Sequence, residues 1–169
     1  QEDVTINKSI QLLPIASDSM FVVFGEYTIL PAAGRQVTIV GMDNLNGSIS
    51  LTANAPGFSP MQFNLFNSAI RDSVYITGTG VISRLSGNDI DDKVFVGVST
   101  LTGNEFTDDV TIQSDASLTS EDTLYVVGNR LARPLFWEST THYFYIANTI
   151  FKNASGLTIN NIKAGAGQN

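Results

Sequence analysis

Short runs of alternating β-branched and aromatic residues constrain the fold of this chain more than any other feature. They occupy residues 37–40, 48–52, 73–77, 94–98, 110–113 and 123–127. Each run is bounded by Gly, Asn, Asp or Pro, which readily adopt turn conformations. No stretch of about eleven residues has the period of an amphipathic helix. Many short strands separated by turns predict an all-β, antiparallel sandwich or barrel.

A sandwich fits this pattern better than a barrel. Strand lengths vary, and residues 21–24 and 94–98 are apolar at almost every position, as in central strands of packed sheets. Asn46-Gly47 lies between two alternating runs and predicts a tight hairpin, because both residues tolerate positive φ. Gly87-Asn88 and Gly103-Asn104 are further turn signals of this kind.

Composition excludes several classes of function. The chain has 169 residues, no Cys, 16 acidic residues and nine basic residues. It is long enough to bury a core without covalent cross-links. The absence of Cys excludes disulfides, thiolate metal sites and Cys nucleophiles. The acidic balance argues against nucleic acid as a partner. No apolar run approaches the ~18 residues that span a bilayer, so no membrane span is expected.

The sequence also predicts a compartment. It starts at Gln1 instead of Met, and Thr, Ser, Asn and Gly are abundant while Lys and Glu are few. Such a start is typical of a chain from which a signal peptide has been removed. We therefore expect an extracellular or cell-surface location.

Residues 20–130 resemble an immunoglobulin-like β-sandwich module of exported and cell-surface Bacteroidetes-type proteins. The resemblance rests on the order of Phe24-Gly25, residues 40–53, Gly57-Phe58, residues 103–114 and residues 125–128. It implies an antiparallel immunoglobulin-like sandwich over residues 1–132, including an N-terminal strand. It also implies a spacer or adhesion unit without enzymatic activity or cofactor.

Three stretches, DSMFVVFGE, DSVYITGTG and DTLYVVGNR, begin with Asp followed by Ser or Thr. Under this alignment they lie in three different strands and are not copies of a repeat. One interpretation is that Asp and the hydroxyl residue hydrogen-bond the backbone where a strand begins. The other is O-glycosylation, because each matches an acceptor pattern of the same bacterial group. The predicted acceptors are Ser19, Ser73 and Thr123.

Residues 133–169 continue the strand pattern beyond the resemblance and are expected to add a C-terminal hairpin. This hairpin is too apolar to stand free in water. It packs either on its own sandwich or on that of a neighbouring copy, as in strand exchange between filament subunits. The N-terminal segment alternates in the same way. The predicted interface consists of Ile6, Ile10, Leu12, Phe144, Ile146, Ile150, Phe151, Leu157 and Ile159.

Candidate chemistry is sparse. His142 is the only histidine, and no nucleophile elbow accompanies it. The segment Asn88-Asp89-Ile90-Asp91-Asp92 is rich in acidic residues but lacks the spacing of a calcium loop, so a solvated turn is the better interpretation. Trp137, Tyr143 and Tyr145 form either part of a core or an aromatic platform for sugar rings. No metal and no cofactor are expected.

These features predict a non-enzymatic extracellular structural protein that binds copies of itself through terminal strands, as a subunit of a surface filament. The alternative is a monomeric adhesion or carbohydrate-binding module with glycans as partners. A phage virion protein is a third, weaker alternative.

Overall fold

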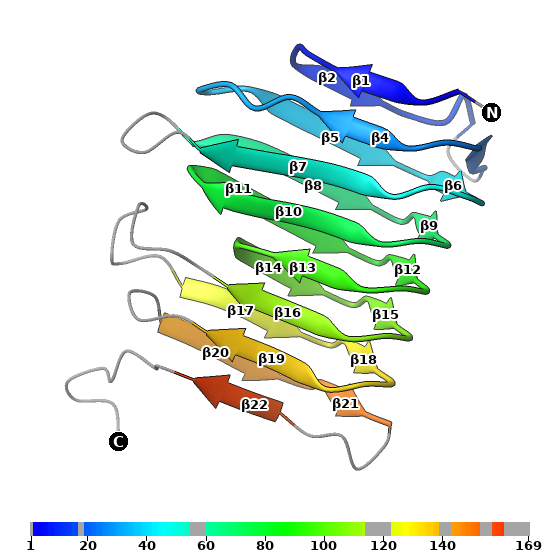
Figure 1. The fold of residues 1–169 in the computed structure, drawn as a ribbon. Helices are drawn as coiled ribbons and strands as arrows, with labels where there is room; N and C mark the ends of the chain where they lie inside the picture. Colours follow the sequence, from blue (N-terminus) through cyan, green and yellow to red (C-terminus); the bar gives the residue numbers. More distant parts are fainter. Residues whose placement is uncertain are drawn as a thin grey trace.

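The chain winds into a solenoid of three parallel β-sheets (Figure 1). The computed structural model describes residues 2–16, 19–54, 60–113, 123–138, 143–152 and 157–160. Sheet A has eight strands: β1 (Val4–Ile6), β4 (Tyr27–Ile29), β7 (Ile49–Asn54), β10 (Val74–Thr79), β13 (Val94–Val96), β16 (Val110–Gln113), β19 (Leu135–Glu138) and β22 (Leu157–Asn160).

Sheets B and C have seven strands each. Sheet B contains β2 (Ile10–Leu12), β5 (Gln36–Val40), β8 (Met61–Phe66), β11 (Val81–Ser86), β14 (Val98–Thr102), β17 (Thr123–Val127) and β20 (Tyr143–Ala147). Sheet C contains β3 (Phe21–Val23), β6 (Met42–Asn44), β9 (Ala69–Ile70), β12 (Asp89–Ile90), β15 (Glu105–Phe106), β18 (Arg130–Leu131) and β21 (Ile150–Phe151).

Each of the first seven coils of the solenoid contributes one strand to each sheet, β22 of sheet A begins an eighth, and corresponding strands of neighbouring coils pair. The prediction of an antiparallel immunoglobulin-like sandwich is therefore wrong. Alternation reports which side chains face a core, but it is the same in parallel and antiparallel strands. Coil length also varies, from 16 residues between the paired Val94 and Val110 to 27 between the paired Ile10 and Val37. A fixed sequence period is therefore absent.

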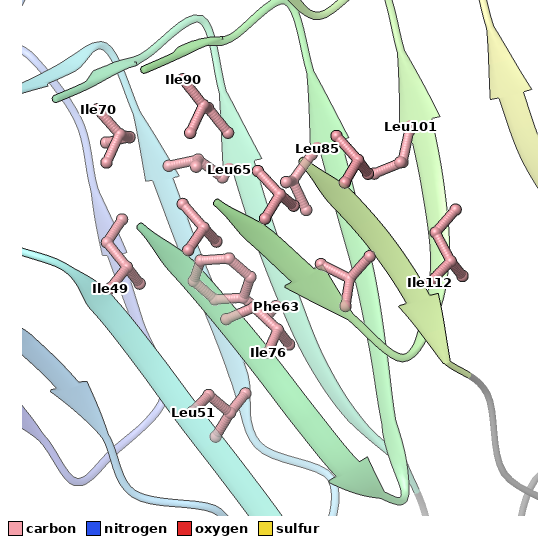
Figure 2. Close-up of a cluster of buried hydrophobic side chains, with 14 of the residues drawn as sticks. Ile49, Leu51, Phe63, Leu65, Ile70, Ile76, Leu85, Ile90, Leu101 and Ile112 are labelled. Atoms are coloured by element: carbon pink, nitrogen blue, oxygen red, sulfur yellow. The ribbon is translucent and has the colours of Figure 1, made fainter. Parts of the chain in front are cut away.

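The core fills the space enclosed by the three sheets. Every second residue of a strand points inward, and these residues stack on their register partners in neighbouring coils. Figure 2 shows Ile49 and Leu51 from sheet A near Phe63 and Leu65 from sheet B, with Ile70 from sheet C. All five are at most 1% exposed. Stacking of β-branched and aromatic side chains is the main stabilising contribution, because it removes their apolar surface from water.

The corners between sheets B and C use residues with positive φ. Gly41, Asn67, Gly87, Gly103, Gly128 and Asn148 occupy these corners with φ between 48° and 68°. Gly and Asn adopt this left-handed region at little cost. The residue after the corner is Asn in three consecutive coils, at Asn88, Asn104 and Asn129, and all three are buried.

Asn46-Gly47 does not form the expected hairpin, because it connects β6 of sheet C to β7 of sheet A. Gly47 has φ of 147°, and a Cβ there would lie 2.1 Å from the carbonyl oxygen of Gly25. The amide of Gly25 in turn donates to the carbonyl of Asn46. Glycine is therefore needed at this corner so that two coils can approach closely.

The C-terminal strands extend the same three sheets. β19 pairs with β16, β20 with β17 and β21 with β18, and β22 pairs with β19. The strands expected to form a separate hairpin after residue 132 thus belong to further coils: β19 and β22 pair in parallel, and β20 and β21 lie in the other two sheets. At the other end, β1 pairs with β4 and β2 with β5.

Candidate ligand-binding face

The outer faces of the three sheets differ in chemistry. Sheet C is charged: Arg71 contacts Asp89 and Asp91 at 3.2 and 2.9 Å, and Lys152 pairs with Glu105. The hydrogen bond from Arg71 to Asp91 raises the pKa of the Arg71 guanidinium, and the bond from Lys152 lowers the pKa of Glu105. These pairs are partly exposed and satisfy one another, so the face offers little to a ligand.

Sheet B carries a ladder of outward-pointing side chains across seven coils. Gln11 pairs in register with Thr38, then follow Asn64, Arg84, Thr100, Tyr125 and Tyr145. Neighbouring strands in a sheet lie about 4.8 Å apart, so the side chains of register partners follow each other at that spacing along the solenoid axis. We call these seven residues the sheet B ladder.

The corners explain why six of these side chains, all except Gln11, line up. Arg84 lies three residues before Gly87, Thr100 three before Gly103 and Tyr125 three before Gly128. The register of each strand is therefore set by the positive-φ residue that ends it. The residue directly after the ladder residue, such as Leu85 after Arg84 or Leu101 after Thr100, points inward and is fully buried. The spacing to the corner residue therefore determines both the direction and the position of these six members of the ladder.

The first part of the ladder is polar. Ser9, Ile10, Gln11, Gln36 and Thr38 line an open hollow of about 320 Å³ on the outer side of β2 and β5. Nδ2 of Asn64 donates to Oγ1 of Thr38 at 3.0 Å, which holds both side chains in place. The Gln11 and Gln36 side chains are exposed. Amide groups of this kind donate and accept hydrogen bonds, as hydroxyl-rich ligands require.

The last part of the ladder is aromatic. Tyr125 and Tyr145 are 43% and 53% exposed, and their ring centroids lie 6.0 Å apart at an interplanar angle of 57°. Thr100 precedes them in the register. The rings are inclined, so they do not form one flat platform; each has its own face and phenolic hydroxyl. Such rings stack on the C–H faces of sugars and hydrogen-bond their hydroxyl groups.

The structure separates the three residues of the expected aromatic platform. Trp137 is 2% exposed and points into the core from sheet A, so its ring is not available for stacking. Tyr145 lies on the outer face of sheet B, and Tyr143 lies on the same strand, with its side chain outside the described residues. The partner of Tyr145 is Tyr125, which the sequence reasoning missed. Its position three residues before Gly128 was the available signal.

The predicted glycosylation sites have different surroundings. The Ser73 hydroxyl is buried and donates to Asp92 at 3.1 Å, while Oδ1 of Asp72 accepts from the Ser73 amide at 2.6 Å. Asp72-Ser73 thus has the strand-entry role, and a glycan there would require this contact to break. Ser19 is exposed and donates to the carbonyl of Ala16. The side chain of Thr123 lies outside the described residues.

The predicted interface residues lie in terminal coils of the solenoid. Ile6 is buried, Ile10, Leu12, Ile146 and Phe151 are partly buried, and Ile150 is 56% exposed. Phe144, Leu157 and Ile159 lie in strands β20 and β22, with side chains outside the described residues. The terminal strands pair within the chain, and binding to another copy through them stays a prediction.

In the described part of the chain, no group of three His, Cys, Asp or Glu residues is placed to hold a metal ion. His142 lies outside the described residues. Within the acidic segment 88–92, Asn88 is buried, Asp89 and Asp91 pair with Arg71, and Asp92 accepts from Ser73.

Comparison with known proteins gives no relative: no family model, no curated protein and no solved structure matches the chain. The class that the fold defines is an all-parallel β-solenoid. Among the described residues, no helix is both long and apolar enough to cross a membrane.

Proposed function

We propose that this protein is a non-catalytic carbohydrate-binding module that holds an extended glycan along the outer face of sheet B. The observation that carries the proposal is the sheet B ladder, which places two amides, a guanidinium, two hydroxyls and two exposed tyrosines in one line. Thr38 and Asn64 are buried at 8% and 5% exposure, and a linear ligand lying parallel to the solenoid axis would contact the other members in turn.

The chemistry of the ladder supports a sugar polymer over a protein partner. The hollow at Gln11 and Gln36 is open and polar, which suits a hydroxyl-rich ligand that keeps part of its hydration. Tyr125 and Tyr145 add the apolar ring faces that sugars use for stacking. The ladder contains no carboxylate and no imidazole, so it supplies binding groups without the acid and base pair of a glycosidase.

Sheet A provides the internal comparison. Its outer ladder runs from Thr5 through Thr28, Ser50, Tyr75, Phe95, Thr111 and Phe136 to Thr158. It also contains aromatic residues, but two of the three are phenylalanines, which cannot hydrogen-bond a sugar. Tyr75 is 39% exposed and thus a matched tyrosine on a different face.

The test is a panel of immobilised oligosaccharides, both neutral and acidic, followed by calorimetry of any that bind. We expect Tyr145→Ala and Tyr125→Ala each to weaken binding by about tenfold, equivalent to about 1.4 kcal/mol. Tyr75→Ala should leave binding within about twofold. Binding that depends on Tyr75 and not on the sheet B tyrosines would contradict the proposed face, and absence of binding to the whole panel would contradict the function. The extracellular location stays a prediction.

A further inference from the structure

The outer face of sheet B has an unusual charge distribution for such an acidic chain. The outward residues of its described strands are Gln11, Gln36, Thr38, Val40, Gln62, Asn64, Phe66, Ile82, Arg84, Ser86, Thr100, Thr102, Tyr125, Val127, Tyr145 and Ala147. None of these is acidic, although the whole chain has 16 acidic residues against nine basic ones. The single charge on this set is the guanidinium of Arg84.

Arg84 is exposed and forms no ion pair with any described residue. Arg71 pairs with Asp89 and Asp91, Lys152 pairs with Glu105, and Arg35 donates to the backbone carbonyls of Leu30 and Asn7. The other described cations, Lys8, Lys93, Arg130 and Arg133, also lack an ion pair with a described residue, but they lie outside the strands of sheet B. An unpaired guanidinium on a face without carboxylates is complementary to an anion, and its planar fork suits a carboxylate in particular.

Arg84 also has a fixed relation to the tyrosines. It pairs in register with Thr100, and Thr100 pairs with Tyr125. Two strand spacings, or about 10 Å, therefore separate Arg84 from Tyr125 along the axis. One extended oligosaccharide can span that length, with one sugar on a tyrosine and the charged group of another at Arg84.

We propose that Arg84 makes this face selective for acidic glycans, by pairing with the carboxylate of a uronic acid while a neighbouring sugar stacks on Tyr125 or Tyr145. This inference rests on the proposed function, because it assigns Arg84 a role within the same glycan-binding ladder. Since Arg84 is exposed, salt should weaken the preference for the acidic sugar.

The test uses oligomers of galacturonic acid and the same oligomers with every carboxylate methyl-esterified, which differ in charge but not in backbone. We expect the intact protein to bind the acid form about tenfold or more tightly than the ester at low salt, as a charge-assisted hydrogen bond allows. Arg84→Gln should remove this preference while ester binding stays within about twofold. Arg84→Lys should keep part of the preference, and Arg130→Gln, an exposed cation on sheet C, should keep all of it.

The outcomes separate this inference from the proposed function. Equal binding of acid and ester, or a preference that survives Arg84→Gln, would overturn the role of Arg84 alone. Binding of neutral sugars in the panel with no binding of the acid form would also overturn it alone. Absence of binding to every oligosaccharide would overturn both. Loss of ester binding in Arg84→Gln would show that Arg84 supports the face as a whole, which also contradicts selectivity.

Discussion

The side-chain amide nitrogen of Asn88 donates a hydrogen bond of 2.9 Å to Oδ1 of Asn104, and Asn104 makes the same bond to Asn129. The backbone amides of Asn88 and Asn104 donate to the same two oxygens at 3.0 Å. Each side chain also donates to a carbonyl of the preceding coil, Leu65, Leu85 or Leu101. This asparagine ladder satisfies buried polar groups at the corner between sheets B and C, where the chain turns sharply.

Asn104→Ala should therefore destabilise the fold strongly. The change removes the side-chain acceptor of the Asn88 backbone amide, and it removes one hydrogen bond each from the Asn88 side chain, the Leu85 carbonyl and Oδ1 of Asn129. We therefore expect a loss of about 2–4 kcal/mol in the free energy of unfolding. Urea denaturation followed by circular dichroism measures it. Asn46→Ala, an exposed asparagine at another corner, should change stability by about 0.5 kcal/mol or less. Equal effects of the two substitutions would show that the asparagine ladder contributes nothing to the free energy of unfolding.

Two corner glycines should respond differently to alanine. Gly103 has φ of 62°, and a Cβ added there would meet no heavy atom within 4 Å. Gly103→Ala should therefore lower the free energy of unfolding only by the cost of holding alanine in the left-handed region, about 1–2 kcal/mol. Gly103→Asn should cost less, because Asn67 and Asn148 hold the same corner in other coils. Gly47→Ala places a Cβ against the Gly25 backbone and should cost about 3 kcal/mol or more. Thermal unfolding of the three variants checks this order, and a Gly47→Ala protein as stable as Gly103→Ala would contradict it.

Trp137 is the only tryptophan and a buried core residue, so its fluorescence reports on folding and not on ligand binding. We expect native emission to be protected from iodide quenching and unchanged when a glycan binds. Trp137→Ala should cost about 3–5 kcal/mol, as for other buried aromatic residues. Strong quenching of the native protein would place the indole at the surface and contradict the orientation of β19.

The ion pair of Glu105 and Lys152 gives a small, predictable pH dependence. The bond from Lys152 lowers the pKa of Glu105 in the folded state, so its contribution is present above the unfolded pKa of Glu and is lost as pH falls through the lower folded value. Because both groups are more than a third exposed, the contribution should be well under ~1 kcal/mol. Comparing Lys152→Met with the unmodified protein at pH 7 and pH 3 measures it. A stability difference that grows on acidification would have the wrong sign.

Much of the strand content could be predicted from sequence, but the direction of the strands could not. Val110-Thr111-Ile112 alternates in the same way whether its neighbours run parallel or antiparallel. The turn residues were also found, yet Gly87-Asn88 and Gly103-Asn104 are corners between sheets, where a hairpin was the familiar interpretation. The order of coils depends on contacts between residues far apart in sequence, which alternation does not report.

The chain contains a short repeated stretch, but it is not the Asp-Ser or Asp-Thr stretch noted in the sequence. The stretches beginning at Asp18, Asp72 and Asp122 contain β3, β10 and β17, which lie in sheets C, A and B, so they are not equivalent positions. The equivalent stretches are LSGNDI, LTGNEF and VVGNRL, starting at Leu85, Leu101 and Val126. Each stretch begins with an inward residue of sheet B and ends with an inward residue of sheet C. The corner Gly and the Asn of the asparagine ladder occupy its third and fourth positions. Spacings of 16 and 25 residues between them obscure the pattern.

The candidate site was harder to predict than the strands, because its members come from seven coils. Tyr145 was among the sequence candidates, whereas Tyr125 and Arg84 were not, and Trp137 was expected beside Tyr145 but points into the core. The residue type of a Tyr or Trp in an alternating strand does not show whether its side chain faces the core or the solvent. Only the position relative to the corner residue distinguishes the outward Tyr125 from the inward Leu124.

The most direct test of the parallel solenoid is a methyl NOE spectrum of the protein in solution. Leu65, Leu85, Leu101 and Val126 are consecutive register partners in sheet B, all pointing into the core. The structure predicts strong NOEs from Leu85 to Leu65 and Leu101, and from Leu101 to Val126. A spectrum that lacks these contacts, and instead shows the cross-strand pattern of antiparallel pairs such as β10 with β11, would contradict the fold. It would also contradict the sheet B ladder, on which the proposed function depends.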